Sequence, residues 1–417
     1  MITVIITYLL KLSILFYKIQ VIFLKKFLAL ILIVIFMFSG CEKSTKENAV
    51  TPQSSNENII GVWINYNEIQ NLTNDCDNQT QLNEKIISML NEFRKYNINT
   101  IFLHLRAFDD CFYSSKIYPP SEYCVNDNNE LKFDILQSFI DCSKDFNIEI
   151  HAWVNPYRIR KDNKTDLINK NTLAGRWYAE NPNDQRLIIT ENNIFYNPAY
   201  IEVQKYVLSG IKEILDNYSV GGIHIDDYFC PTTSEKIDTE IYNDYIENGG
   251  TLSLADFRRQ NINTLMTSIY SLVKSYNKDL RFSISPSADI DADFNSHYAD
   301  VKLWALEKGY ADYLIPQIYF GFQHETMPFE TILNEWLKLK TDNSKIAIGL
   351  SIYKSGKIDN YAKSGSNEWL DNTNILKRQI SIINNNENLN GYVYYSCEYL
   401  LNDFNENLKQ EKLNIIS

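Results

Sequence analysis

The most informative segment of this 417-residue chain reads Gly221-Gly222-Ile223-His224-Ile225-Asp226-Asp227-Tyr228-Phe229, an apolar run that ends on two adjacent carboxylates and two aromatic rings. A buried strand is apolar throughout, so acids at its carboxyl end must face water, a cation or a substrate. The alternative is that they cap the next helix or pair with a surface lysine. The two glycines before the run and the two aromatic rings after it favour a functional site.

Apolar, β-rich runs alternate with longer amphipathic segments eight times after residue 58. The predicted strands are Ile60–Asn65, Thr100–Arg106, Glu149–Asn155, Gly222–Asp226, Arg281–Ser285, Tyr313–Ile318, Lys345–Ser351 and Gly391–Ser396. Helices with apolar residues three and four apart are predicted between them, for example at Thr80–Tyr96, Phe133–Phe146, Pro198–Tyr218, Ser253–Ser275 and Asn374–Asn384. The pattern predicts an α/β fold, a (β/α)8 TIM barrel over residues 59–417.

An open, doubly wound sheet shares this alternation of strands and helices. That fold binds nucleotides through a glycine-rich loop, and neither GxGxxG nor GxxxxGK[ST] follows any predicted strand. No cofactor is therefore predicted. The net charge of -12 and the lack of a basic block argue against a nucleic-acid partner, which would need clustered Lys and Arg.

The first 58 residues have the composition of an export signal followed by a tether. Lys25-Lys26 precedes the apolar run Phe27–Phe38 and then Ser39-Gly40-Cys41, the order of a secretory signal with a lipobox. We predict a signal over residues 1–41, with a start near residue 24 as an alternative to Met1, lipidation of Cys41, and a flexible linker over residues 42–58. These segments predict a lipid anchor that holds the protein at the outer face of the cell membrane; an uncleaved anchor is the alternative.

Six further cysteines lack the spacing of a metal finger: Cys76, Cys111, Cys124, Cys142, Cys230 and Cys397. Cys111 and Cys124 bracket one loop, but spacing alone assigns no disulfide. His104, His151 and His224 come from neighbouring predicted strands and would be a possible ligand set. Because all three precede the strand ends, hydrogen-bonded structural histidines are favoured and no metal site is predicted.

Polar side chains stand at the carboxyl ends of six predicted strands, where a βα barrel keeps its active site. They belong to the segments Leu103–Asp110, His151–Arg158, His224–Asp227, Ser283–Ser287, Pro316–Phe320 and Tyr394–Glu398. After the fifth strand, Asp289, Asp291 and Asp293 alternate without the glycine and glutamate of an EF-hand, which predicts a solvated loop.

Seven motifs follow one another along the chain: Gly61-Val62-Trp63, Arg106–Ser114 with its ending Phe112-Tyr113-Ser114, His151–Arg158, Tyr196-Asn197-Pro198, Gly222–Phe229, Ile284-Ser285-Pro286 and Pro316-Gln317-Ile318-Tyr319. In this order they resemble the family 10 glycosyl hydrolase-like lipoproteins, bacterial envelope proteins with a TIM-barrel catalytic domain. The resemblance runs from Ile60 to Leu400. It departs at Ala107-Phe108-Asp109, where the family usually has a proline and a small residue.

The resemblance implies glycosidase activity, directed at peptidoglycan glycan strands and notably at strands stripped of stem peptides. Glycoside cleavage needs one carboxylic acid to protonate the leaving oxygen and a second group to manage the positive charge that develops at the sugar carbon. We assign Asp227 as the acid and Asp226 as its catalytic partner. Neighbours in a regular strand point to opposite faces, so both reach one cleft only where the strand frays or bulges.

Ten further residues are predicted to contact the substrate: Arg106, Trp153, Asn155, Tyr157, Arg158, His224, Tyr228, Gln317, Tyr319 and Glu398. Arg158 is a candidate contact for a lactyl carboxylate, and Glu398 is a spare catalytic candidate. Trp63 and Trp153 are candidates for stacking on sugar rings, although tryptophans within strands also fill cores.

The prediction is a membrane-anchored glycoside hydrolase that acts on an N-acetylhexosamine polysaccharide, with peptidoglycan as the first choice. A second enzyme hypothesis is hydrolysis of a partly deacetylated hexosamine exopolysaccharide. A third hypothesis is a glycan-binding lipoprotein that lacks activity, since a barrel alone does not establish catalysis.

Overall fold

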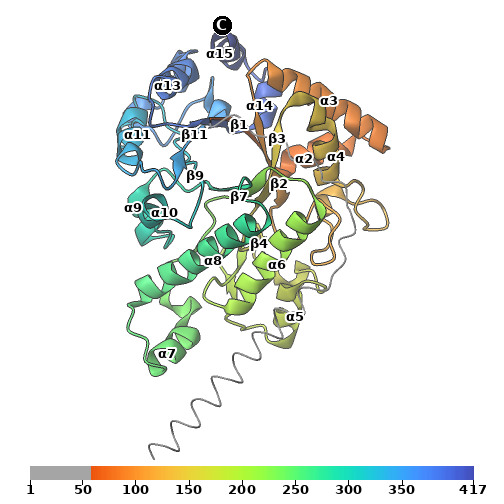
Figure 1. The fold of residues 1–417 in the computed structure, drawn as a ribbon, viewed down its shortest axis with the longest axis vertical. Helices are drawn as coiled ribbons and strands as arrows, with labels where there is room; N and C mark the ends of the chain where they lie inside the picture. The colour runs from red at the N-terminus through yellow and green to blue at the C-terminus, as the bar shows by residue number, and fades with distance from the viewer. Residues whose placement is uncertain (1–57) are drawn as a thin grey trace, which may run out of the picture. The chain divides into compact units, whose positions relative to one another are not determined.

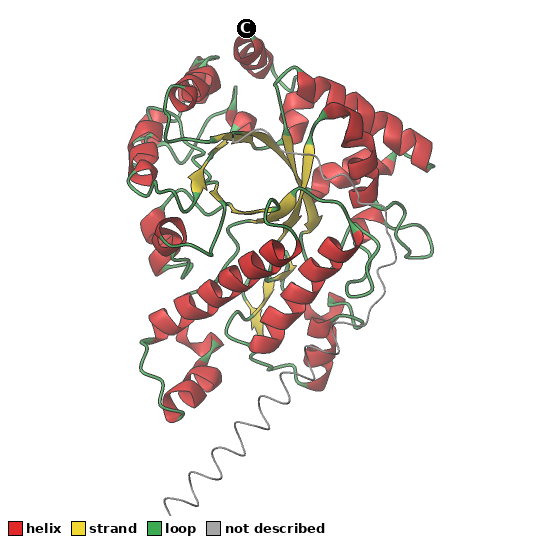
Figure 2. Cartoon of the chain, in the orientation of Figure 1, coloured by secondary structure: helices red, strands yellow, loops and turns green. Residues whose placement is uncertain are grey.

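The computed structural model describes residues 58–417, in which parallel strands form a ring with helices outside it (Figures 1 and 2). The strands of the ring are β1 (Ile59–Ile64), β2 (Thr100–Arg106), β3 (Glu149–Val154), β7 (Gly222–Ile225), β8 (Arg281–Ile284), β9 (Tyr313–Leu314), β10 (Lys345–Ile346), β11 (Ile348–Leu350) and β12 (Gly391–Tyr394).

The sheet closes on itself through one segment of the chain. Its order is β10-β9-β8-β7-β3-β2-β1-β12-β11, and β10 and β11 are the two halves of residues 345–350. The first half pairs with β9 and the second with β12. Ala347 N donates to Leu314 O at 3.1 Å, and Gly349 N donates to Pro316 O at 2.9 Å. Nine short strands therefore fill eight positions, and the predicted (β/α)8 barrel is confirmed.

Large side chains fill the barrel interior, as expected for a packed barrel rather than a pore. They form one buried cluster of Ile59, Trp63, Phe102, Trp153, Tyr313, Ile315, Ala347 and Val393. A larger apolar layer, which includes Val62, Ile101 and Ile223, lies between the strands and the helices. The strands are thus covered on both faces, which explains why their sequences are nearly continuous apolar runs.

The helices are α2 (Tyr66–Asn74), α3 (Gln79–Arg94), α4 (Ile135–Ser143), α5 (Leu173–Glu180), α6 (Ile201–Asn217), α7 (Thr239–Glu247), α8 (Leu254–Tyr276), α9 (Ile290–Asn295), α10 (Val301–Leu306), α11 (Phe329–Leu337), α12 (Glu368–Asp371), α13 (Ile375–Asn384), α14 (Cys397–Leu401) and α15 (Glu406–Ile416). The neighbours α6 and α8 lie side by side (Figure 1). Between residues 58 and 417, none of them combines the length and the apolar content that a membrane span needs.

The predicted elements agree with the structure except near some strand ends. The segment predicted as Tyr313–Ile318 is a regular strand only at Tyr313–Leu314, because Pro316 has no N–H to continue the ladder. The segment predicted as Lys345–Ser351 is interrupted at Ala347. The five predicted helices all occur, with ends displaced by at most three residues.

A small antiparallel sheet between β3 and α6 was not predicted. It consists of β4 (Arg158–Arg160), β5 (Leu187–Ile189) and β6 (Ile194–Tyr196), in the order β4-β6-β5. Each strand has three residues, which is too short for the alternation of polar and apolar residues to be recognised. The sheet begins directly after the end of β3 and so places Arg158 at the mouth of the barrel.

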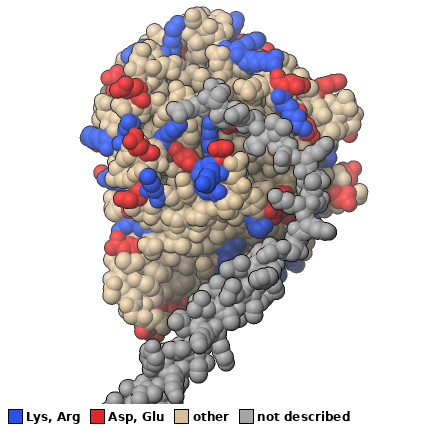
Figure 3. Space-filling model, viewed as in Figure 1, with Lys and Arg blue, Asp and Glu red and all other residues tan. Residues whose placement is uncertain are grey.

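Acidic and basic side chains are interspersed on the face of the molecule shown in Figure 3. All six cysteines in the described part of the chain are free thiols, Cys111 and Cys124 included. The predicted signal, the lipidation of Cys41 and the linker before residue 58 lie outside the described residues.

Candidate active site

The candidate site begins where β7 stops. The last residue of β7 is Ile225, whose carbonyl accepts a hydrogen bond from Ser285 N at 2.7 Å. Asp226 and Asp227 follow outside the ladder, and Phe229 N donates to Asp227 O at 3.0 Å in a tight turn. The strand therefore ends before the two acids, and their side chains need not point to opposite faces as neighbours in a regular strand do. This is the condition under which both acids can reach one cleft.

Asp226 is the buried member of the pair, with 3% of its surface exposed. Its Oδ2 accepts a hydrogen bond from Trp153 Nε1 at 3.0 Å, and its Oδ1 accepts one from Asn155 Nδ2 at 3.1 Å. A carboxylate has about four acceptor positions, so these two neutral donors leave room for a further N–H or O–H.

Asn155 fixes the end of β3 against this carboxylate. Its Oδ1 accepts hydrogen bonds from Tyr157 N at 3.2 Å and Arg158 N at 2.9 Å, so the chain turns sharply after the strand. The amide nitrogen is then left to donate to Asp226. The Asn-Pro-Tyr-Arg segment thus orients both the buried acid and the arginine that follows it.

Burial, and after it the neighbouring charge of Asp227, raise the pKa of Asp226 from its ordinary value of 3.8 to about 7. Burial also raises the pKa of Asp227, while its own backbone N–H, the Gln317 side chain and His297 oppose that rise. Two adjacent carboxyls of this kind do not ionise easily together. The pair is therefore suited to hold one proton near neutral pH.

Asp227 is half-buried and lines a cavity of about 490 Å³. This volume lies within the range of about 300–1,000 Å³ that ligand pockets occupy. The wall is made by the turn between β5 and β6, the residues that follow Asp227, and the turn after α9, namely Thr190, Glu191, Asn192, Asn193, Phe195, Tyr228, Phe229, Cys230, Pro231, Thr232 and His297. Asp227, and not Asp226, is the acid that a ligand in this cavity would meet.

Arg158 and Tyr228 form a second wall beside the pair. The Arg158 guanidinium lies between two rings, 4.7 Å from the Phe108 centroid and 4.6 Å from the Tyr228 centroid. Tyr228 is 40% exposed. The sequence predicted substrate contacts at both residues, and the structure places both beside the acids with surface to offer.

Gln317 and Tyr319 also reach the mouth of the barrel. Gln317 Nε2 donates to Ser285 O at 3.2 Å, and Tyr319 packs against Tyr353 and Tyr395 with centroid separations of 6.0 Å and 5.7 Å. The carboxyl of Asp227 influences both Tyr319 and Tyr395 electrostatically. The predicted residues from β7 and β9 are thus brought together, and Tyr353 and Tyr395 join them.

Four predicted substrate contacts need correction because their side chains are buried, with 1% exposure for Arg106 and 0% for Asn155, Tyr157 and His224. Arg106 donates to Asn155 O at 2.7 Å and so braces the loop after β3. His224 lies inside the barrel, where its Nε2 accepts from Trp63 Nε1 at 2.9 Å and its Nδ1 contacts Ser283 Oγ at 2.8 Å. These residues support the site from below and have no free surface for a sugar.

The two tryptophans predicted to stack on sugar rings, Trp63 and Trp153, are buried as well. Trp63 is 2% exposed and Trp153 is 6% exposed, and the Trp153 ring stacks on His104 with centroids 3.6 Å apart. Trp153 therefore orients Asp226 through its N–H instead of offering a ring face to a sugar. Within residues 58–417, no group of three or more His, Cys, Asp or Glu side chains is arranged to hold a metal ion.

Glu398 lies apart from the aspartate pair. It stands in the first turn of α14, where its backbone N–H donates to Glu68 Oε1 at 2.7 Å, and it does not line the cavity that Asp227 faces. Glu68 also accepts a hydrogen bond from Ser396 Oγ at 2.6 Å, and burial raises its pKa to about 7. Glu68 was not predicted from the sequence, because a glutamate in the first turn of a helix is normally a capping residue and its sequence pattern does not indicate catalysis.

The prediction of a solvated loop at Asp289–Asp293 is wrong in one respect. Asp289 caps α9, but Asp293 is completely buried, and its Oδ1 is 3.0 Å from His297 Nδ1. His297 lines the same cavity as Asp227. The acid and the histidine are four residues apart, the spacing at which two side chains meet across one helical turn, and this spacing is the signal in the sequence that could have indicated the pair.

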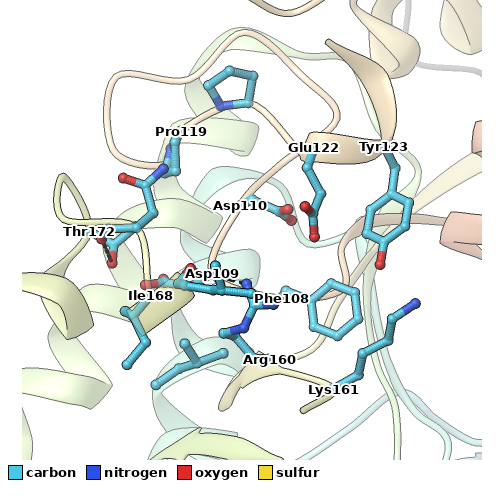
Figure 4. A pocket seen from close by; sticks show the side chains of 14 residues that line it. Phe108, Asp109, Asp110, Pro119, Glu122, Tyr123, Arg160, Lys161, Ile168 and Thr172 are labelled. Carbon is cyan, nitrogen blue, oxygen red and sulfur yellow. Dashed lines mark hydrogen bonds between the residues drawn. The ribbon is translucent and has the colours of Figure 1, made fainter. Parts of the chain in front are cut away.

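A second pair of aspartates follows β2 and lines a smaller pocket of about 160 Å³ (Figure 4). Asp109 accepts a hydrogen bond from Tyr196 Oη at 2.6 Å, and its Oδ1 lies 3.7 Å from Arg106 Nη2. Burial raises the pKa of Asp110 to about 7. Figure 4 shows the Asp110 and Glu122 carboxylates directed toward one another, with Tyr123 and Lys161 beyond them.

Comparison with known proteins agrees with this geometry. The family model described as glycosyl hydrolase-like 10 matches residues 58–369. Glycosyl hydrolase DigH of Escherichia coli (strain K12) is 25% identical over 413 residues, which cover 89% of this chain and 92% of that protein. Glycosyl hydrolase YngK of Bacillus subtilis (strain 168) is 28% identical over 344 residues, which cover 78% of this chain and 64% of that protein.

Solved structures with the same fold include the glycoside hydrolase domain of PgaB (BpsB) from Bordetella bronchiseptica, with a TM-score of 0.54 and 10% identity over 87% of this chain and 99% of that one. The catalytic domain of a β-amylase from Paenibacillus polymyxa has a TM-score of 0.53 and 7% identity over 85% of this chain and 97% of that one. At these identities the likeness concerns the barrel alone.

Proposed function

This chain belongs to the glycosyl hydrolase-like 10 family and is a glycoside hydrolase, and from that premise we propose that it cleaves glycans containing N-acetylhexosamine, with peptidoglycan strands as substrate. One observation carries the proposal. An open carboxyl, Asp227, adjoins a buried carboxyl, Asp226, at the mouth of the barrel, beside a cavity of about 490 Å³.

In this proposal, protonated Asp227 donates its proton to the glycosidic oxygen as the bond from that oxygen to C1 breaks. The carbonyl oxygen of the substrate's own acetamido group attacks C1 and forms an oxazolinium ring. Asp226 accepts the acetamido N–H through the acceptor position that Trp153 and Asn155 leave free. Water then opens the ring, and the Asp227 carboxylate takes a proton from that water.

The side chains around the pair suit a glycan with a carboxylate on its muramic residues. Arg158 has its guanidinium between the Phe108 and Tyr228 rings, which leaves its edge free to form a charge-assisted hydrogen bond. The exposed ring of Tyr228 offers an apolar face with a polar tip. The half-buried Gln317 and Tyr319 complete the proposed polar contacts.

The proposal includes attachment to the membrane through a lipid on Cys41, which would hold the enzyme against the cell envelope. It rests on the order of charged, apolar and small residues before Cys41. Metabolic labelling with a radioactive fatty acid tests it. Label should enter the wild-type chain and be lost in Cys41→Ala; equal labelling of both would refute the anchor.

The test of the function is incubation of the full-length chain and its Asp227→Asn variant with peptide-free glycan strands, with products identified by mass spectrometry. Short saccharides with reducing ends from the wild type alone support a glycosidase acting through Asp227. Cleavage of a partly deacetylated hexosamine polymer in place of the strands would reassign the substrate. Retention of glycan on both proteins without products would make the chain a binding protein.

A further inference from the structure

The helix α9 and the turn after it contain a buried acid and a histidine that the proposed mechanism does not use. Asp293 has no exposed surface, and its Oδ1 is 3.0 Å from His297 Nδ1. The His297 side chain is 39% exposed and lines the cavity that Asp227 also lines. The two nitrogens of an imidazole point in different directions, so a ring whose Nδ1 faces Asp293 directs its Nε2 away from that carboxyl.

The backbone fixes this arrangement. His297 N donates to Ala292 O at 3.2 Å, and Ala299 N donates to Asp293 O at 2.9 Å, so the turn after α9 is closed on both sides of the histidine. Tyr298 between them has a φ of 54°, a left-handed conformation that costs of order 1–3 kcal/mol in a residue other than glycine. Such strain persists where surrounding contacts hold it, and the buried Tyr298 hydroxyl accepts a hydrogen bond from Arg258 at 2.9 Å.

The charges that face His297 are mostly negative. The hydrogen bond to Asp293 raises the pKa of His297, and the charges of Asp227 and Asp289 raise it further. Glu191 and Cys230 line the same cavity from the other two walls. Burial raises the pKa of Asp293 to about 6, and His297 opposes that rise. The dyad thus favours an imidazolium on the cavity side of a buried carboxylate.

We propose that the Asp293–His297 dyad is a positioning device for Asp227: the imidazolium of His297 faces that carboxyl across the cavity and sets the pH at which it ionises. Asp293 acts through His297 by fixing which ring nitrogen points outward. This inference deepens the proposed function and rests on it for its catalytic meaning. The dyad passes no proton to the substrate in this account.

The effect on Asp227 has a defined sign. A nearby positive charge stabilises the ionised carboxylate, so His297 holds the pKa of Asp227 below the value that burial alone would give. Replacing His297 with glutamine should therefore let that pKa rise. As a consequence, the loss of activity at alkaline pH, where the acid becomes deprotonated, should move to higher pH.

The first measurement needs no substrate. Carboxyl carbons of aspartates are labelled with ¹³C in the full-length chain, and the Asp227 signal is identified by its absence from the Asp227→Asn spectrum. The chemical shift of this signal is followed as the pH is changed. In His297→Gln the midpoint of the Asp227 titration should rise by about one pH unit, the lower end of the effect of a neighbouring opposite charge. An unchanged midpoint would overturn the proposal. Glu191→Gln, which alters another wall of the cavity, is the matched control and should shift the midpoint less.

Asp293 is tested through the histidine itself. The chain has only five histidines, so the ring signal of His297 can be assigned by comparison with His297→Gln. Its midpoint should fall by about one unit in Asp293→Asn, which keeps the shape and removes the charge. A midpoint that stays at the wild-type value would show that the two residues are not coupled.

The catalytic consequence is tested with the glycan strands. His297→Gln should change kcat by less than about tenfold at pH values where Asp227 is protonated in both proteins, because an acid whose pKa is about one unit higher donates its proton less readily, and it should displace the alkaline limb upward. If His297→Gln has the rate of the wild type and the same alkaline limb in its pH–rate profile, the inference is refuted and the proposed function stands. If the wild type cleaves no glycan while the carboxyl midpoint still moves, the proposed function has failed and the electrostatic coupling stands.

Discussion

Two strands of the barrel each lead into a pair of adjacent aspartates, Asp109-Asp110 after β2 and Asp226-Asp227 after β7. The first member of each pair is buried, with 6% exposure for Asp109 and 3% for Asp226. Their partners differ. Asp109 lies 3.7 Å from the buried Arg106 guanidinium, whereas Asp226 is held by the neutral N–H groups of Trp153 and Asn155.

The open members of the pairs also differ in what they face. Asp227 opens onto the cavity of about 490 Å³, and Asp110 onto the pocket of about 160 Å³ in Figure 4. Burial raises the pKa of Asp110 to about 7, so a raised pKa alone does not distinguish a catalytic acid from a structural one. Two features distinguish the pair after β7: the buried carboxyl accepts hydrogen bonds from neutral donors only, and the open carboxyl has space for a sugar ring beside it.

The largest expected effect is at Asp227. Asp227→Asn removes the proton donor while keeping the shape of the side chain, and kcat should fall by about 10²- to 10⁴-fold. Affinity for the glycan should remain, because the walls of the cavity are unchanged. Initial rates of saccharide release and equilibrium binding check the two parts. A variant that keeps more than a tenth of the wild-type rate would remove Asp227 from the role of acid.

The pair after β2 should affect stability instead. Asp109→Asn leaves the Arg106 charge buried without its counter-ion, and the free energy of unfolding should fall by about 3 kcal/mol, the low end for breaking a buried ion pair. The kcat of the surviving folded protein should stay close to that of the wild type. Urea unfolding measures the first quantity and steady-state kinetics the second. A stable variant with a large loss of kcat would reverse the contrast between the two pairs.

Asp226 should destabilise the fold as pH rises. Its pKa is about 7 in the folded chain against an ordinary value of 3.8, so the unfolded chain releases this proton first and stability falls between about pH 4 and pH 7. Asp226→Asn, whose side chain does not ionise, should therefore gain about 4 kcal/mol of stability relative to the wild type on going from pH 3.5 to pH 8, the equivalent of about three pKa units.

Urea unfolding at both pH values checks this sign. The exposed Asp127→Asn serves as the baseline for removal of one carboxylate. A variant that gains nothing over the wild type on going from pH 3.5 to pH 8 would mean that the Asp226 carboxyl is not costly to ionise in the folded chain.

The smallest expected effect concerns the layer beneath the site. Trp63→Phe removes the donor to His224 Nε2, and the free energy of unfolding should fall by about 1 kcal/mol, the usual net value of one hydrogen bond. Because His224 lies inside the barrel below the acids, kcat should change little. Thermal unfolding and kinetics test both statements, and a large loss of activity with unchanged stability would place His224 in the chemistry after all.

The sequence predicted the barrel and the place of Asp226 and Asp227 because both follow from local pattern. Apolar runs of strand length recur eight times, and an acid pair after Gly221-Gly222 marks a strand end. The depth of a side chain along the barrel axis is not local. His224, two residues before Asp226, therefore looked like a contact, although it lies fully buried and bonded to Trp63 and Ser283.

The same limit explains the residues that were missed. Asp293 and His297 meet across one helical turn, but only their position at the end of α9 brings them to the cavity of Asp227. The sheet that carries Arg158 over the barrel mouth is made of strands of three residues each, which leave no periodic signal. The sequence pattern therefore predicts the helices and strands, whereas tertiary packing determines which polar residues are buried beneath the site and which are exposed at the mouth of the barrel.

The most direct test of the contrast between the two acid pairs is kcat/KM of Asp227→Asn and Asp110→Asn, measured in parallel on one preparation of peptide-free glycan strands. We expect a loss of at least about 100-fold for Asp227→Asn, the minimum for removing an acid catalyst, and a value for Asp110→Asn within about threefold of the wild type. The reverse ranking, or equal losses in the two variants, would contradict it.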